Sequence, residues 1–145
     1  MIDGSQAAIE DLNAPVSTIY TMTGAYKTSV MRDGFKGGKA IFTCPNPPIK
    51  CGGAPLKIMF LSEETFRKHK IRQDSEVLYY AGTPNWFPPV KKYNEAIGRI
   101  CDTKGINGHF GHNLIKIDKE KSLATFKTST GTIDVEYDFL HFVPP

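Results

Sequence analysis

Short apolar runs alternate with longer mixed stretches along most of the chain, a pattern typical of an α/β domain. The runs are rich in β-branched and aromatic residues, which predicts strands at Lys39–Cys44, Glu76–Ala81 and Phe139–Val143. Two longer stretches predict helices, at Leu56–His69 and at Val90–Lys104, and Gly105 follows the second as a helix stop. Strand, helix and strand in this order predict a parallel βαβ unit with a right-handed crossover.

The part of the chain between the second helix and the last strand has a different period. A further strand is predicted at Ile106–Asn113, and apolar residues then alternate by two in three segments: Leu114–Ile117, Leu123–Lys127 and Ile133–Tyr137. Turn residues at 118–121 and 130–131 would join these segments as antiparallel neighbours. The predicted fold is therefore α/β, a three-layer Rossmann-like parallel sheet with an antiparallel β-meander.

The first residues have weaker patterns. Met1–Pro15 is polar and acidic, and we expect a loop there. Between Val16 and Arg32, apolar and aromatic residues recur at spacings of three and four, which indicates a helix. A turn follows at residues 33–38. We therefore assign residues 1–34 to a lead-in segment with a possible short helix, and residues 35–145 to the main domain.

Composition excludes several classes of protein. The 145 residues suit one domain, and 40% hydrophobic and 23% charged residues are ordinary for a globular protein. The net charge of +3 is too small to favour nucleic-acid binding. Apolar runs stay well below the roughly 20 residues of a membrane span. Three cysteines without dense spacing do not predict a disulfide scaffold, and the first residues lack the pattern of a signal or transit peptide.

The candidate chemistry lies between the first main strand and its helix, where the sequence reads Cys51-Gly52-Gly53-Ala54-Pro55. Free N–H groups and the positive end of the helix dipole meet at such a junction, so a thiolate there is stabilised and nucleophilic. Gly52 and Gly53 let a planar ligand approach closely, and Pro55 suits a first helical turn. The alternative is that Cys51 is an ordinary structural cysteine. A G-x-G-x-x-G fingerprint is absent from this loop.

Other cysteines, histidines and aromatic residues favour structural interpretations. Cys101, His109 and His112 could suggest a metal site, but strand residues three apart point to opposite faces, so we expect no metal. We interpret Cys44 and Cys101 as core residues, with a redox disulfide between Cys44 and Cys51 as a weaker alternative. Trp86 and Phe87 follow the second strand, where they would either plug the sheet end or line a ligand site.

Residues 45–68, PNPPIKCGGAPLKIMFLSEETFRK, resemble the central segment of the sulfide:quinone oxidoreductases of mitochondrial type. In that family a similar proline-rich turn leads into Cys-Gly/Ala-Gly-Ala-Pro-x-Lys and an apolar helix. The resemblance continues through Val90–Tyr93, Asn113–Ile115 and Tyr137–Pro145, and covers roughly residues 35–145. Gly52 stands where alanine is common in relatives. The resemblance implies the second nucleotide-binding-like domain of a two-dinucleotide flavoprotein.

It also implies a reaction. Enzymes of this family oxidise sulfide to sulfane sulfur and pass two electrons through FAD to ubiquinone. Cys51 matches the cysteine that works beside the flavin, paired with a second cysteine much later in the chain; Gly52, Gly53 and Pro55 would lie near the flavin. Sulfide opens the sulfur-bridged pair, leaving a persulfide and a thiolate, and an acceptor such as glutathione, sulfite or cyanide removes the sulfane sulfur. The family implies a peripheral place on the mitochondrial inner membrane.

Parts of that enzyme have no counterpart in this sequence, which lacks the FAD-binding G-x-G-x-x-G, a late Gly-Asp segment and a second redox cysteine after Cys101. We therefore expect a central domain of a longer enzyme, whose targeting segment is not in this chain. Alone it should neither hold FAD tightly nor turn over. Two alternatives stay open: a non-catalytic Rossmann-like module that binds a nucleotide or a partner, with Cys51 structural, and a nicotinamide-binding domain of a related flavoprotein reductase.

Overall fold

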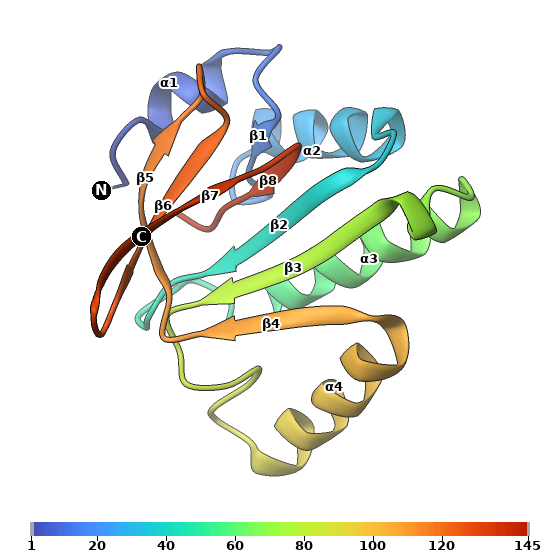
Figure 1. Ribbon diagram of the computed structural model, residues 1–145, viewed down its shortest axis with the longest axis vertical. Helices are drawn as coiled ribbons and strands as arrows, with labels where there is room; N and C mark the ends of the chain where they lie inside the picture. The colour runs from blue at the N-terminus through green and yellow to red at the C-terminus, as the bar shows by residue number, and fades with distance from the viewer. Residues whose placement is uncertain (1, 145) are drawn as a thin grey trace.

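A parallel sheet forms the centre of the fold in a computed structural model that describes residues 2–144 (Figure 1). Its strand order is β1-β8-β2-β3-β4, and every pairing in it is parallel. The strands are β1 (Val16–Ser17), β2 (Gly38–Cys44), β3 (Ser75–Ala81), β4 (Ile106–Phe110) and β8 (Phe139–His141). The predicted parallel βαβ unit is confirmed, and the last apolar run does return to this sheet beside β2.

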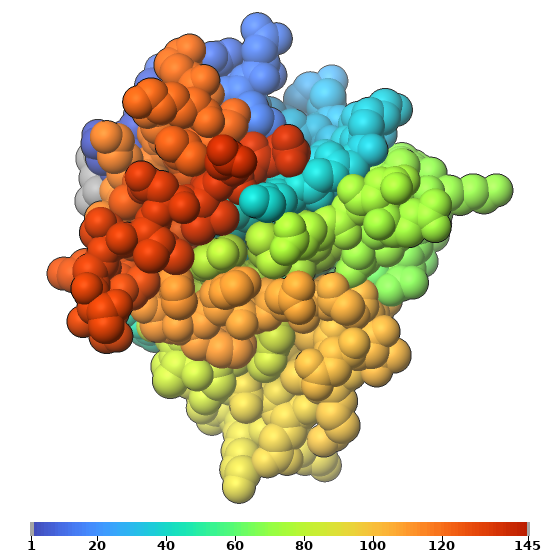
Figure 2. Space-filling model, viewed as in Figure 1, coloured from blue at the N-terminus to red at the C-terminus, as the bar shows by residue number. Residues whose placement is uncertain are grey.

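Alternation along β2 and β3 supplies two hydrophobic cores, one on each face of the sheet. Phe42 and Tyr79 face the helices α2 (Met22–Gly34), α3 (Ala54–Lys68) and α4 (Lys91–Lys104). Ile41 and Tyr80 face the antiparallel meander of β5 (Asn113–Asp118), β6 (Leu123–Thr128) and β7 (Gly131–Glu136). Helices, parallel sheet and meander make three layers, so the predicted fold class is confirmed. In Figure 2 the meander, in orange to red, covers only part of the sheet.

Helices α3 and α4 have the predicted positions. Helix α3 has its N-cap at Gly53, carries a proline in its first turn and buries Leu56, Met59 and Phe66. Leu61 is 57% exposed, so not every apolar residue of this helix packs on the sheet. Helix α4 ends where expected, because Gly105 adopts φ 65°, the left-handed conformation of a helix C-cap.

The first 34 residues differ from the prediction. A short helix, α1 (Ser5–Glu10), occupies part of the expected loop, and the predicted helix from Val16 begins only at Met22. Val16 and Ser17 instead form strand β1, which pairs with Leu140 and His141 at the edge of the sheet. Thr21 then caps α2 by accepting a hydrogen bond from the Gly24 N–H at 3.0 Å. Sheet pairing by a distant strand outweighs the local helical spacing here.

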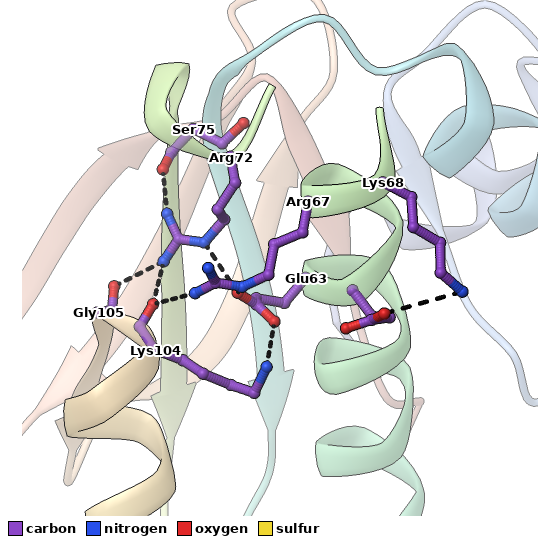
Figure 3. Close-up of polar contacts among 8 residues, drawn as sticks. Glu63, Arg67, Lys68, Arg72, Ser75, Lys104 and Gly105 are labelled. Atoms are coloured by element: carbon purple, nitrogen blue, oxygen red, sulfur yellow. Dashed lines mark hydrogen bonds and ion pairs between the residues drawn. The ribbon is translucent and has the colours of Figure 1, made fainter. Parts of the chain in front are cut away.

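Charged residues gather at the edge of the parallel sheet where its strands begin, the amino edge (Figure 3). Glu63 of α3 is fully buried and forms ion pairs with Arg67, with Arg72 of the short 3₁₀ helix η1 (Arg72–Asp74), and with Lys104 of α4. The back half of α3 is therefore not uniformly solvated, because Glu63 is buried and Arg67 lies against its carboxylate.

Candidate functional site

The carboxyl ends of the parallel strands carry the loops that contain the candidate residues. The loop after β2 holds the cysteine and glycines, and the loop after β3 holds Trp86 and Phe87. The two loops meet: the Gly82 N–H donates to the Cys44 carbonyl at 2.9 Å, and a Cβ added at Gly52 would lie 3.9 Å from the Phe87 ring. Both loops therefore lie at the edge of the sheet formed by the carboxyl ends of its strands.

Cys51 is exposed and lies two residues before the Gly53 N-cap of α3. Its carbonyl accepts a hydrogen bond from the Ala54 N–H at 2.9 Å, which turns the chain into the helix. A Cβ added at Gly53 would meet nothing within 4 Å, so the surface beside the thiol is open. Pro55 is buried in the first turn. The structure therefore presents a reachable thiol two residues before a helix start.

Two hollows flank the Cys51 loop. A cavity of about 110 Å³ with an almost wholly apolar wall lies on one side, between Cys44, Gly52, Trp86, Phe87 and the neighbouring prolines. A larger hollow of about 460 Å³ lies on the other side, lined by Tyr20, Thr21, Pro48, Ile49, Lys50 and Pro144. Both hollows border the segment between Pro45 and Gly53, which carries the exposed thiol of Cys51 and is called the ridge below.

The other two thiols are buried, as the core interpretation of Cys44 and Cys101 expects. Burial raises the pKa of Cys44, with a smaller opposing effect from the Tyr79 hydroxyl. Burial also raises the pKa of Cys101 to about 12. Neither thiol is an available thiolate at neutral pH, so nucleophilic sulfur chemistry within residues 2–144 is left to Cys51.

Trp86 closes the sheet end, as the first of the two interpretations for it predicts. Its ring stacks on Tyr79 with centroids 5.3 Å apart and meets the Phe110 ring edge-on at 5.1 Å. Phe87 packs against the same core and also lines the small apolar cavity. One aromatic residue therefore plugs the sheet while its neighbour shapes the wall beside the cysteine loop.

His109 and His112 do not point apart, so that expectation is wrong. His109 stacks on Tyr80 with centroids 4.3 Å apart, and the His112 ring lies 6.0 Å from that of His109. Gly111 has φ 70° and turns the chain between β4 and β5, which breaks the strand alternation that the prediction assumed. Within residues 2–144, no group of three or more His, Cys, Asp or Glu side chains is placed to hold a metal ion.

Sequence reasoning missed two residues near the cysteine loop. Tyr20, which the sequence assigned to a helix, lies in the loop after β1, and its hydroxyl donates to the Cys51 carbonyl at 3.4 Å. His141 is fully buried and accepts a hydrogen bond from the Ile19 N–H through Nε2 at 3.1 Å. Tyr20 and Cys51 are 31 positions apart in the sequence, and Ile19 and His141 are 122 positions apart. Local sequence patterns therefore carry no signal for these two contacts.

Comparison with known proteins finds relatives that match most of this chain. No family model matches it. Proteins named mitochondrial sulfide:quinone oxidoreductase match it at 38% identity in Dictyostelium discoideum, 36% in mouse and 35% in Schizosaccharomyces pombe, over 90%, 90% and 99% of the chain. The chain spans only 29%, 29% and 32% of those relatives.

Solved structures agree on the fold. A chain in the Tetrahymena thermophila mitochondrial ATP synthase has a TM-score of 0.83 at 21% identity, over 99% of this chain and 37% of its own length. The sulfide:quinone oxidoreductase of Aquifex aeolicus has a TM-score of 0.77 at 15% identity, over 99% and 33%. The helices in the described part of the chain are all too short or too polar to cross a membrane.

Proposed function

We propose that this chain, which belongs to the sulfide:quinone oxidoreductase family and matches one segment of its mitochondrial members, is the central domain of such an enzyme, and that Cys51 is its sulfur-carrying thiol. The resemblance seen in the sequence is confirmed by these matches. The observation that carries this proposal is the exposure of Cys51, while Cys44 and Cys101 are buried. A cysteine kept only for packing would be buried, so the exposed thiol favours the catalytic interpretation over the structural one.

The residues beside Cys51 fit a flavin. Gly53 leaves open space where a side chain would project, and Gly52 leaves contact distance to Phe87. In this proposal Gly52 and Gly53 let the flavin approach the loop, and Pro55 fixes the start of α3 near the flavin. FAD, when bound in the parent enzyme, accepts two electrons and passes them to ubiquinone.

The part of Cys51 in the reaction is thiol exchange. Hydrosulfide attacks a sulfur bridge between Cys51 and the second cysteine of the parent, forming one sulfur–sulfur bond and breaking another. One cysteine becomes a persulfide and the other leaves as a thiolate. A nucleophilic acceptor then removes the sulfane sulfur and leaves the first cysteine as a thiolate too. Re-forming the bridge between the two cysteines releases two electrons, for which FAD would be the acceptor. Exchange of this kind depends on access and thiolate fraction, which an exposed position before α3 supplies.

The parent would work at the mitochondrial inner membrane, because its relatives are named mitochondrial and its electron acceptor is a membrane quinone. The chain alone, at under a third of the relatives' length, should hold no FAD and should not turn over. An absorbance spectrum of the purified 145-residue chain checks this expectation, because a flavin-loaded, yellow preparation contradicts it.

The decisive experiment uses the full-length parent under anaerobic conditions. Sulfide is added while flavin absorbance is recorded for the wild type, for Cys51→Ser and for the control Cys101→Ala. We expect bleaching in the wild type and the control and none in Cys51→Ser. If bleaching survives the Cys51 substitution, or the full-length protein binds no flavin, the domain is a binding module and Cys51 is structural.

A further inference from the structure

The ridge that carries Cys51 has few internal supports. Within residues 47–52, the hydrogen bonds that the structure shows all meet at one atom, the carbonyl oxygen of Cys51. One comes from the Ala54 N–H at 2.9 Å and lies inside the ridge's own turn. The other comes from the Tyr20 hydroxyl at 3.4 Å and reaches residues 47–52 from another element. At the start of the ridge, the Asn46 N–H also donates to Asn113 Oδ1 of β5 at 3.3 Å.

Tyr20 is well placed to hold this carbonyl, because its own backbone is fixed to the sheet. The Tyr20 N–H donates to Thr18 Oγ1 at 3.3 Å, and the preceding Ile19 N–H donates to the buried His141 ring at 3.1 Å. His141 belongs to β8, between β1 and β2. A continuous series of contacts therefore runs from β8 through residues 18–20 to the carbonyl of Cys51.

The phenol also stays a donor. Burial, and then the neighbouring thiols of Cys51 and Cys44, raise the pKa of Tyr20 above its ordinary value. The hydroxyl therefore remains protonated through the neutral and mildly alkaline range in which a thiolate would react. Phenylalanine has the same ring without this proton, so it would fill the same space beside Ile49 and Pro48 but leave the carbonyl unheld.

We infer that Tyr20 is a positioning residue for Cys51, holding the Cys51 carbonyl and with it the backbone that presents the thiol before α3. The inference rests on the proposed function for its biological meaning, but its geometry concerns this chain alone. Without the Tyr20 hydroxyl, residues 47–52 lose their hydrogen bond from another element, and the thiol is held less firmly in its place before the helix.

The test measures the rate of Cys51 alkylation by iodoacetamide against pH in the 145-residue chain, with Cys51→Ser as background. The variants are Tyr20→Phe and the matched control Tyr26→Phe, whose side chain is 75% exposed on α2. In Tyr20→Phe we expect a changed alkylation profile, with the rate at neutral pH lower by about threefold or more. Tyr26→Phe should match the wild type, and thermal unfolding should show all three proteins folded.

An unchanged alkylation profile in folded Tyr20→Phe overturns the inference, as does an equal shift in Tyr26→Phe. Failure of the proposed function gives a different result: flavin bleaching that persists in full-length Cys51→Ser, whatever Tyr20→Phe does to alkylation. In the full-length parent, Tyr20→Phe should slow flavin reduction by sulfide about as much as it slows alkylation and leave the flavin content unchanged. Loss of flavin in that variant would instead assign Tyr20 to cofactor binding and overturn its positioning role.

Discussion

The buried carboxylate of Glu63 accepts a hydrogen bond from the Lys104 ammonium at 2.8 Å and so joins α3 to the last turn of α4 (Figure 3). Arg72 reinforces the junction, because its guanidinium bonds Glu63 at 3.2 Å and the Lys104 carbonyl at 2.7 Å. Burial alone would raise the pKa of Glu63, but hydrogen bonds from Lys104 and Arg67 outweigh it and leave the pKa below its ordinary value.

The first prediction concerns this junction. Glu63→Gln leaves the partly buried Arg72 and Lys104 without their counter-charge, so we expect the free energy of unfolding to fall by about 3 kcal/mol. The control Glu64→Gln removes only an exposed pair with Lys68 at 3.8 Å and should cost about 0.5 kcal/mol or less. Urea unfolding followed by circular dichroism measures both. Equal losses in the two variants would mean that the Glu63 contacts add nothing beyond a surface ion pair.

The second prediction is an acid sensitivity set by His141. Burial lowers the pKa of this imidazole to about 3, whereas an unfolded histidine titrates near about 6.5. The unfolded state therefore binds the extra proton first, and stability falls as the pH drops from about 6.5 towards about 3, by up to about 1.4 kcal/mol per unit. Urea unfolding at a series of pH values measures this slope.

His141→Gln supplies the control for that slope. Glutamine offers an oxygen that can still accept from the Ile19 N–H but does not titrate, so its stability should depend less on acid pH than that of the wild type. His69→Gln changes an exposed histidine and should keep the wild-type slope. If His141→Gln retains the full slope, groups other than His141 cause the acid sensitivity.

The sequence predicts the parallel sheet and meander well because their signals are local. Prolines and glycines end the apolar runs on either side of α3, and alternation by two identifies the meander strands. Strand β1 escapes prediction because two residues, Val16 and Ser17, carry no period, and only pairing with β8 makes them a strand. The buried role of Glu63 escapes for a related reason, since two of its cations come from later elements, at Arg72 and Lys104.

The candidate site divides in the same way. The Cys51 loop is recognisable because a strand, a glycine pair and a helix start follow one another directly in the sequence. Tyr20 is not, because its contact with the Cys51 carbonyl depends on the placing of β1 against β8. The prediction for the histidine pair fails for a different reason. Gly111 is visible in the sequence, but its left-handed φ of 70° is set by the path of the chain into the meander. This conformation brings His112 back beside His109.

The third prediction concerns Lys27, a buried lysine on α2 that acts without a carboxylate. Its ammonium donates to the carbonyls of Ala8, Ile9 and Asp11, at 2.9, 3.4 and 2.6 Å, and so satisfies the end of α1. Lys27→Met should therefore lower the free energy of unfolding by about 1–3 kcal/mol and speed amide hydrogen exchange in α1. Lys91→Met, at a lysine whose side chain is 91% exposed, should do neither. Unchanged exchange in α1 would show that its end is held by other contacts.

The last prediction uses Trp86, the single tryptophan of the chain, as its own reporter. Two glycines face its ring at different distances. A Cβ at Gly108 would lie 2.7 Å from the indole and 2.8 Å from the Phe110 ring, whereas a Cβ at Gly98 of α4 would lie at an ordinary 3.6 Å. Gly108→Ala should therefore push Trp86 off the sheet end, shift its fluorescence emission and cost about 1–3 kcal/mol of stability.

Gly98→Ala is the matched change, because it adds the same methyl group next to other atoms of the same ring, Cδ1 and Nε1. It should leave the emission in place and stabilise the helix by up to about 1 kcal/mol, since alanine is a better helix former than glycine. Opposite signs in the two unfolding free energies, with an emission shift in Gly108→Ala only, would establish that the indole is clamped against β4 and not merely resting on α4. Equal emission shifts in both variants would contradict that arrangement, and with it the firm wall that Trp86 and Phe87 give the Cys51 loop.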